Sequence, residues 1–338
     1  MTARLDALRH WSASHHGLET AAPELEIVTD DASFRRYFRL HLDNGHSRIL
    51  MDAPPERENS HAFVEIARQW RSRGIPVPEL YHVDLEQGFI EMEDLGDEML
   101  RQRLAHNDQR EALMMQAIST SVAIAVLPAD DLPVYDAQWL GEELDLFPQW
   151  CLAQWLDIAV PEGWPQVREQ LVTAVAAQPG VCVHRDFHAQ NLMWHDDRLW
   201  VIDFQGAVLG PLTFDLVCLL RDRNNAWPES DQERWIEAWR QQAQNAGVMA
   251  PVAPEAFRRM FDLTSAQRSL KVLGGFCRLA LRDDKPRYLT LLPLFAEHVR
   301  QGLTGQPGFE TFMQWFDTCF VPALDARLIQ HRTGCQES

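Results

Sequence analysis

Short apolar and alternating runs dominate the first hundred residues and predict a small antiparallel sheet. The Asp43-Asn44-Gly45 sequence between two of the runs is typical of a hairpin turn. Apolar positions from Phe63 to Trp70 recur at helical spacing, which predicts one helix with Ser60 as its N-cap and Gly74 as its end. The strands are expected over residues 25–28, 37–42, 48–51, 79–83 and 88–92.

The rest of the chain has mostly helical periodicity. Ser230 and Glu233 form a predicted capping box, and Gly247 ends that helix. Three short strands interrupt the pattern, at residues 181–183, 192–194 and 199–202. The other helices are expected over residues 101–127, 139–158, 165–177, 254–282 and 288–303. This order predicts an α+β fold with a small sheet lobe, residues 1–95, and a large helical lobe, residues 96–338.

The composition narrows the class of protein. The 338 residues carry 31 basic and 49 acidic side chains, and the resulting charge of −18 argues against nucleic acid as a partner. The longest apolar stretch, residues 122–127, is too short to span a membrane, and residues 1–17 contain no apolar segment of a secretory signal. Six scattered cysteines without CxxC spacing favour reduced thiols and a cytoplasmic location.

Chemically suggestive residues concentrate in one segment, VCVHRDFHAQNLMWHDDRLWVIDFQGA, which covers residues 181–207. Asp186 follows one predicted strand, Asn191 comes five residues later, and Asp203 ends another apolar strand. Phosphoryl transfer needs one carboxylate to orient and deprotonate the attacking hydroxyl. It also needs hard oxygen ligands for Mg²⁺. We therefore assign Asp186 as the base, and Asn191 and Asp203 as the metal ligands.

The HxDxxxxN pattern followed by IDF resembles the aminoglycoside phosphotransferase family of the protein-kinase-like superfamily. The resemblance implies a bilobal fold, ATP as phosphoryl donor and Mg²⁺ as cofactor. It also implies that His184 supports the loop and that Asp215 braces it. Family members typically read HGDLHxxN, which matches His188 but not Arg185. No long activation segment follows Asp203, so a small-molecule kinase is favoured over a protein kinase.

The resemblance also implies a nucleotide site in the small lobe. Backbone groups of Glu93 and Leu95 would meet adenine, with Met92 beside the purine. The expected phosphate loop, residues 29–37, offers Ser33, Arg35 and Arg36. The family's lysine on the third strand is missing, because the only lysines are Lys271 and Lys285. Either one of the arginines Arg35, Arg36 and Arg48 replaces it, or the site is catalytically weak.

Further blocks resemble the bacterial kinases of cell-wall recycling that phosphorylate the anomeric hydroxyl of N-acetylmuramate and N-acetylglucosamine. These blocks are MDAPPE at 51–56, EDLGD at 93–97, LRDRNNAWP at 220–228 and residues 267–289. Arg221, Arg268 and Lys271 would offer positive charge to a lactyl carboxylate, and His188 would face the substrate or support the loop. The alternatives are an aminoglycoside or other small-alcohol kinase, and a nucleotide-binding pseudokinase.

Overall fold

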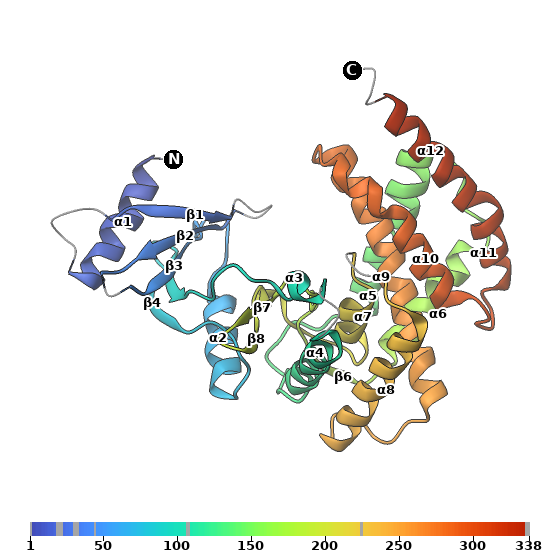
Figure 1. Ribbon diagram of the computed structural model, residues 1–338. Coiled ribbons are helices and arrows are strands. Elements are labelled where there is room, and N and C mark those ends of the chain that lie inside the picture. Colours follow the sequence, from blue (N-terminus) through green and yellow to red (C-terminus); the bar gives the residue numbers. More distant parts are fainter. Residues whose placement is uncertain are drawn as a thin grey trace. The chain divides into compact units, whose positions relative to one another are not determined.

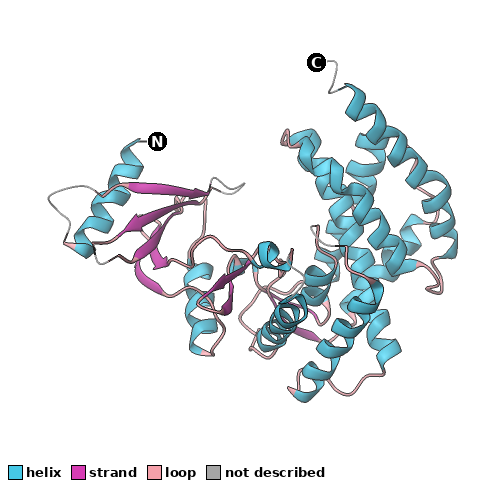
Figure 2. Cartoon of the chain, viewed as in Figure 1, coloured by secondary structure: helices cyan, strands magenta, loops and turns pink. Residues whose placement is uncertain are grey.

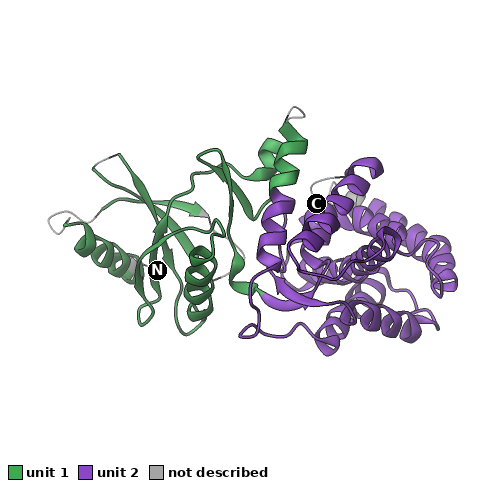
Figure 3. Cartoon of the chain, turned by 90° about the horizontal axis from the view of Figure 1, so that it is seen from below, with its two compact units in different colours: residues 1–116, 189–207 green, residues 117–188, 208–338 purple. Residues whose placement is uncertain are grey.

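The computed structural model describes residues 2–17, 23–29, 34–43, 45–105, 109–223 and 226–334. The chain divides into two compact units, shown in Figure 3. Unit 1 comprises residues 1–116 and 189–207, and unit 2 comprises residues 117–188 and 208–338. Strands dominate the first part of unit 1 and helices dominate unit 2 (Figure 2), so the predicted α+β class is confirmed.

Unit 1 is built on a five-stranded antiparallel sheet with the strand order β1-β2-β3-β5-β4 (Figure 1). All five predicted strands are present, and each bound lies within one residue of its expected position. Asn44 of the predicted hairpin lies outside the described residues, but Gly45 beside it has the positive φ of 80° that a tight turn requires. The strands are β1 Leu25–Thr29, β2 Arg36–His41, β3 Ser47–Asp52, β4 Leu80–Asp84 and β5 Phe89–Glu93.

Helix α1, Thr2–His16, covers one face of this sheet and was not predicted. Its Leu8 packs in one apolar cluster with side chains of β2, β3 and β5, namely Phe38, Leu40, Leu50 and Phe89. Successive strand residues point to opposite faces, so Arg36, Arg48 and Asp52 share this α1 face. Met51 and Met92 lie on the other face, which we call the opposite face.

Unit 1 also holds α2, His61–Ser72, with the predicted Ser60 at its N-cap position. The smaller elements are α3 Leu100–Leu104, the β7–β8 hairpin Leu192–His195 and Arg198–Val201, and the short helix η3 Phe204–Gly206. The hairpin joins unit 1 because the Val201 N–H donates to Pro76 O and the Trp194 N–H to Glu98 O, at 2.7 and 2.8 Å. The lobe boundary at residues 95/96 stays a prediction.

Unit 2 is helical around the 29-residue helix α9, Pro254–Arg282, whose bounds are those predicted from sequence. Helices α5, α6, α7, α10 and η2 all pack against α9. A two-stranded sheet joins the predicted β6, Gly180–Val183, to β9, Val208–Pro211, which was not predicted.

Helix α4, Arg110–Ala125, continues from unit 1 into unit 2. The other helices are α5 Ala137–Leu144, η2 Phe147–Leu156, α6 Trp164–Ala176, α7 Phe214–Leu220, α8 Glu229–Asn245, η4 Pro286–Leu291, α10 Leu292–Leu303, α11 Glu310–Trp315, η5 Phe316–Phe320 and α12 Val321–Gly334.

Four helix predictions need correction. The helix expected over residues 101–127 is two helices, α3 and α4, and the helix expected over residues 288–303 is the 3₁₀-helix η4 followed by α10. The single helix expected over residues 139–158 is two elements, α5 and the π-helical η2. The predicted capping box is wrong, because α8 begins earlier, with Pro228 in extended conformation at the N-cap position. Proline suits this end because the first helical N–H groups have no intrahelical acceptor. Ser230 therefore lies inside the first turn, where its hydroxyl caps nothing.

The part of the chain that the structure describes contains no helix long and apolar enough to cross a membrane. The described cysteines are all free thiols. Cys319 is exposed, and the others are buried, namely Cys151, Cys182, Cys218 and Cys277.

Two adjacent glycines of α9 give a matched test of this packing. A Cβ atom on Gly274 would lie 2.2 Å from the Leu146 carbonyl carbon, whereas one on Gly275 would meet nothing within 4 Å. We expect Gly274→Ala to lower the free energy of unfolding by about 1–3 kcal/mol or more. Gly275→Ala should raise it by about 0.5–1 kcal/mol, because alanine restricts the unfolded chain. Urea unfolding measures both, and equal effects would contradict the close approach of α9 to η2.

Candidate active site

The loop after β6 carries Asp186, and its backbone is hydrogen-bonded to the buried side chain of Asp215 on α7. The two oxygens of Asp215 accept the N–H groups of His184 and Arg185 at 2.7 and 2.9 Å. Burial raises the pKa of Asp215 to about 6, against the opposing effects of the His184 charge and these two hydrogen bonds. The structure thus shows Asp215 bonded to the backbone of this loop, and its bracing role stays a prediction.

Arg185 occupies the position where the family typically has glycine, and its backbone explains that preference. Its φ is 79°, in the left-handed region that costs a non-glycine residue about 1–2 kcal/mol. The side chain is anchored on both sides. Its Nη2 donates to Glu143 Oε1 at 2.7 Å, and its guanidinium lies 4.5 Å from the Trp139 ring centre. These contacts offset the backbone strain.

Asp186 presents an exposed carboxylate surrounded by cationic side chains. Crowding by protein atoms acts to raise its pKa, but the charges of Lys271 and Arg268, followed by those of His188 and His184, lower the pKa below its ordinary value. The Asp186 N–H donates to His184 Nδ1 at 3.2 Å, so the buried histidine supports the loop. The carboxylate is therefore ionised at neutral pH, as a proton acceptor must be.

The predicted substrate residues divide into two environments. Lys271 acts electrostatically on Asp186 and also binds Glu143 Oε1 with its Nζ at 2.8 Å. The Arg268 Nη1 donates to the Arg221 carbonyl at 3.3 Å. The Arg221 guanidinium is instead buried near Phe261 and Asp262, and burial lowers its pKa to about 10. Arg221 thus meets this region through its backbone rather than its charge.

His188 is the remaining predicted substrate residue, and it follows Asp186 on the same loop. Its N–H donates to the Asp186 carbonyl at 2.9 Å. Burial lowers the pKa of its imidazole, against the opposing charges of Asp222 and Asp186. His188 therefore lies among the charged groups around Asp186.

The predicted metal ligands Asn191 and Asp203 lie together in unit 1. Asn191 Nδ2 is 3.4 Å from Asp203 Oδ2, and the Ile202 N–H donates to the Asn191 carbonyl at 3.0 Å. Gln205, for which the sequence indicates no role, donates its Nε2 to Asp203 Oδ1 at 2.6 Å. Asp203 has a φ of 63°, a strained conformation of the kind that concentrates at functional sites. The carboxylate and the amide groups are hard oxygen donors suited to Mg²⁺.

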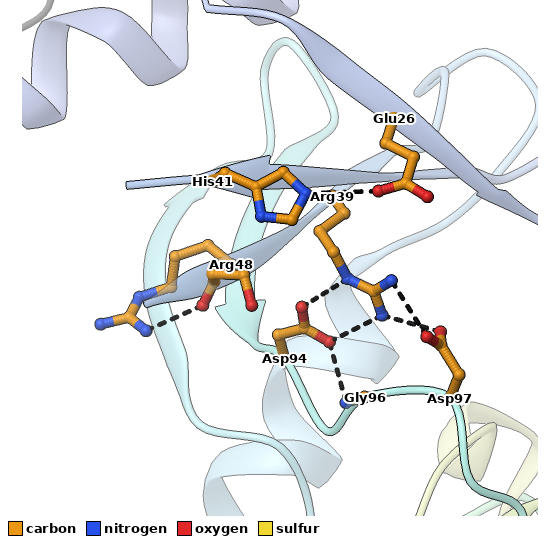
Figure 4. A network of polar contacts seen from close by, with 8 residues as sticks. Glu26, Arg39, His41, Arg48, Asp94, Gly96 and Asp97 are labelled. Carbon is orange, nitrogen blue, oxygen red and sulfur yellow. Dashed lines mark hydrogen bonds and ion pairs between the residues drawn. The ribbon is translucent and has the colours of Figure 1, made fainter. Parts of the chain in front are cut away.

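The predicted adenine-binding segment begins where β5 ends, and a polar network fixes it (Figure 4). The Arg39 guanidinium on β2 lies between Asp94 and Asp97, with its Nε 2.6 Å from Asp94 Oδ2 and its Nη2 2.8 Å from Asp97 Oδ1. The Gly96 N–H donates to Asp94 Oδ1 at 2.9 Å. Burial acts to raise the pKa of Asp94, but the hydrogen bond from Arg39 keeps it lowered.

Backbone groups in this segment differ in availability. The Glu93 N–H is engaged, because it donates to the Glu79 carbonyl at 2.8 Å. The Leu95 N–H makes no hydrogen bond within the described ranges of the chain, although the residue is buried. Met92 is buried at the end of β5 on the opposite face. A ligand with a hydrogen-bond acceptor beside Leu95 would satisfy that donor.

The predicted phosphate loop is only partly described, because Ser33 lies outside the described residues. Arg35 is 7% exposed and pairs with Glu58. Arg36 instead pairs on the α1 face with the fully buried Asp52, which Arg4 of α1 also binds at 2.6 Å. The two neighbouring arginines thus pair with different carboxylates.

The architecture is that of the protein-kinase-like fold. A choline/ethanolamine kinase family protein from Mesorhizobium loti superposes with a TM-score of 0.62 at 18% identity, covering 93% of this chain and 99% of that one. The ADP-bound aminoglycoside phosphotransferase APH(2'')-Ib gives a TM-score of 0.56 at 13% identity, covering 86% and 97%.

Residues 24–255 match the phosphotransferase enzyme family, and the chain belongs to this family. It is similar to two proteins named N-acetylmuramate/N-acetylglucosamine kinase. The one from Pseudomonas putida is 39% identical, with 86% of each chain covered. The one from Neisseria meningitidis is 34% identical, with 87% of this chain and 89% of that protein covered. The chain is therefore an enzyme, and its activity is that of a kinase.

The raised pKa of Asp215 predicts a pH-dependent stability difference. Its pKa is 3.8 ordinarily and about 6 in the folded protein, so the native state binds the extra proton between pH 4 and 6. The protonated Asp215 side chain therefore adds roughly 3 kcal/mol to the free energy of unfolding below pH 4. This contribution is lost as the pH rises through 6. Relative to Asp215→Asn, the wild type should gain stability as pH falls from 7 to 4. A pH-independent difference in denaturant unfolding would contradict this.

The Arg39 network predicts slow local opening of residues 94–97. Charge-assisted hydrogen bonds contribute about 1.5–3 kcal/mol each, so Arg39→Met should speed amide exchange at Gly96 by about tenfold or more. Hydrogen exchange measured by NMR reports this amide. Exposed Arg68 on α2 provides the control Arg68→Met, which should leave the rate unchanged. Unaltered exchange in Arg39→Met would show that the network does not hold this segment.

Proposed function

We propose that the protein transfers the γ-phosphoryl group of ATP to the anomeric hydroxyl of N-acetylmuramate, N-acetylglucosamine or both, giving the sugar 1-phosphate in cell-wall recycling. The 39% identity to the Pseudomonas putida protein, over 86% of this chain, carries the choice of substrate. The aminoglycoside phosphotransferases share the fold at 13% identity, which gives their substrates less support. The single feature that carries the reaction class is the exposed, ionised Asp186 on its braced loop.

In this proposal Asp186 orients the sugar hydroxyl and accepts its proton. The hydroxyl oxygen bonds to the γ-phosphorus as the bond to the bridging oxygen of ADP breaks, without a phosphoenzyme. The lowered pKa keeps the Asp186 carboxylate ionised before the substrate binds. His184 and Asp215 contribute by fixing the backbone that carries it. Positioning of this kind supplies much of the catalysis in phosphoryl transfer.

Asn191 and Asp203 would hold Mg²⁺, which when bound neutralises charge on the phosphate oxygens. Their carboxylate and amide oxygens fit such an ion, and Gln205 holds the Asp203 carboxylate in place. Asn191 comes five positions after Asp186, so their Cα atoms are at most roughly 18 Å apart. The proposal requires that Asp186 and the two metal ligands serve the same phosphoryl transfer.

Residues 1–95 would form the nucleotide-binding lobe and residues 96–338 the catalytic and substrate-binding lobe. Adenine would take the Leu95 N–H as donor and the Glu93 carbonyl as acceptor, beside Met92. The unused Leu95 N–H and the Arg39 network around this segment support that assignment within the described chain.

For the sugar, we propose that Lys271 and Arg268 attract the lactyl carboxylate of N-acetylmuramate, with His188 beside them. Lys271 and Arg268 are the cations that act most strongly on Asp186, and His188 lies beside them. Arg221 would act by holding Arg268 through its carbonyl oxygen. N-acetylglucosamine lacks the carboxylate, so these cations would favour N-acetylmuramate.

Removing the base tests the reaction. Asp186→Asn should lower phosphoryl transfer by about 10²–10⁴-fold while MgATP binding is retained. Asp196→Asn is the matched control, because Asp196 is an exposed acid in the β7–β8 turn with a φ of 49°, which asparagine tolerates. Phosphorus NMR of reactions with either sugar would detect the 1-phosphate. Wild-type turnover in Asp186→Asn would refute the assignment of the base.

The same assay, run with cationic aminoglycosides and small alcohols in place of the sugars, tests the substrate. Phosphorylation of those compounds alone would overturn the sugar proposal and support the aminoglycoside alternative. MgATP binding without transfer to any alcohol would identify a pseudokinase.

A further inference from the structure

The polyphosphate of a nucleotide needs a cation from the protein, and no lysine exists in the first 270 residues. We propose that Arg35, held by Glu58, is the phosphate-binding cation that takes the place of the missing strand lysine. This inference rests on the proposed ATP-dependent function. It chooses among the arginines Arg35, Arg36 and Arg48, which the sequence leaves equivalent.

Arg36 is committed elsewhere. It shares the α1 face with Phe38 and Leu40, and its Nε donates to Asp52 Oδ2 at 3.1 Å. Asp52 is fully buried, so removing Arg36 from this ion pair would leave a partly compensated charge in the interior. Arg36 is therefore a structural link between β2 and β3 under α1.

Arg48 lies on the same α1 face. Its Nε is 3.7 Å from Glu91 Oε1, and its guanidinium lies 4.2 Å from the Tyr81 ring centre. Glu91 also binds His16 of α1 at 3.0 Å. These partners place Arg48 among the residues that attach α1 to the sheet. Arg39 lies on the opposite face, but Asp94 and Asp97 hold it (Figure 4).

Of these three arginines, Arg35 is the one whose printed contacts lead toward the segment that carries Asp203. It directly precedes β2, and its guanidinium lies 5.9 Å from the ring centre of Phe63 on α2. Phe63 stacks on Phe204 at 4.9 Å between ring centres, with an interplanar angle of 22°. Phe204 directly follows Asp203 in the chain. Arg35 thus lies over a pair of stacked rings, and the second ring belongs to the residue that directly follows the predicted metal ligand in the chain.

Glu58 gives Arg35 a fixed direction. Arg35 Nη2 is 3.2 Å from Glu58 Oε2, and the two side chains are only 8% and 17% exposed. The Phe34 N–H also approaches Glu58, at 3.4 Å from Oε1. Guanidinium has five N–H donors in a planar fork, so it can bind a carboxylate and a phosphate at the same time. The pair thereby reproduces the lysine–glutamate ion pair on which kinases depend.

Nucleotide binding measured by calorimetry separates phosphate recognition from adenine recognition. With Mg²⁺ present, Arg35→Met should weaken ATP binding by about 10- to 100-fold and leave adenosine binding unchanged. Arg35→Lys should recover part of the loss, because it restores the charge without the fork. Arg68→Met, an exposed arginine on α2 of the same unit, should bind both ligands as the wild type does.

Thermal unfolding of each variant checks that it is folded. If Arg35→Met does not fold, Glu58→Gln answers the same question, with a smaller loss that is again selective for ATP over adenosine. Unchanged ATP binding in folded Arg35→Met, or an ATP-selective loss in Arg36→Met instead, would overturn the inference. Wild-type protein that binds no MgATP would refute the proposed function itself, so the two failures are distinguishable.

Discussion

The Asp215 carboxylate lies buried beneath the loop of His184, Arg185 and Asp186, and the geometry of that loop depends on it. By accepting two successive N–H groups, it holds Arg185 in a left-handed conformation and directs Asp186 outward. Burial of the charge is unfavourable, as its pKa of about 6 indicates. Such a cost is tolerated where a backbone must be held in one conformation for binding or chemistry.

The sequence was most informative where a pattern is local. Strand bounds followed from short apolar runs, and α9 followed from a long periodic segment that begins at Pro254. Helix α1 could not be predicted from the sequence, because only a few of its positions are buried, among them Leu8 and Ala13. These few positions form an apolar face only when they pack against the sheet. Likewise Asp186, Asn191 and Asp203 were recognisable by spacing, whereas Glu143, Glu58 and Gln205 become relevant only through contacts made after folding.

Because side chains alternate along each strand, the sheet of unit 1 has one face that binds helix α1 and an opposite face that carries predicted nucleotide-site residues. Its α1 face buries apolar side chains together with the ion pairs of Arg36 and Arg48, which secure α1. The opposite face keeps Met51, Met92 and Arg39. A shift of one residue in the register of β2 would exchange these roles, since every side chain would move to the other face. The hairpin turn near Gly45, which sets this register, therefore determines which residues lie on each face of the sheet.

The scarcity of lysine has a consequence for chemical profiling of kinases. Nucleotide probes that carry an acyl phosphate report on a kinase by acylating the amine beside the bound phosphates. The first 270 residues of this chain contain no side-chain amine, and a guanidinium is a far poorer nucleophile because it stays protonated. Surveys built on such reagents would overlook this enzyme however active it is, or would mark it only at Lys271 or Lys285.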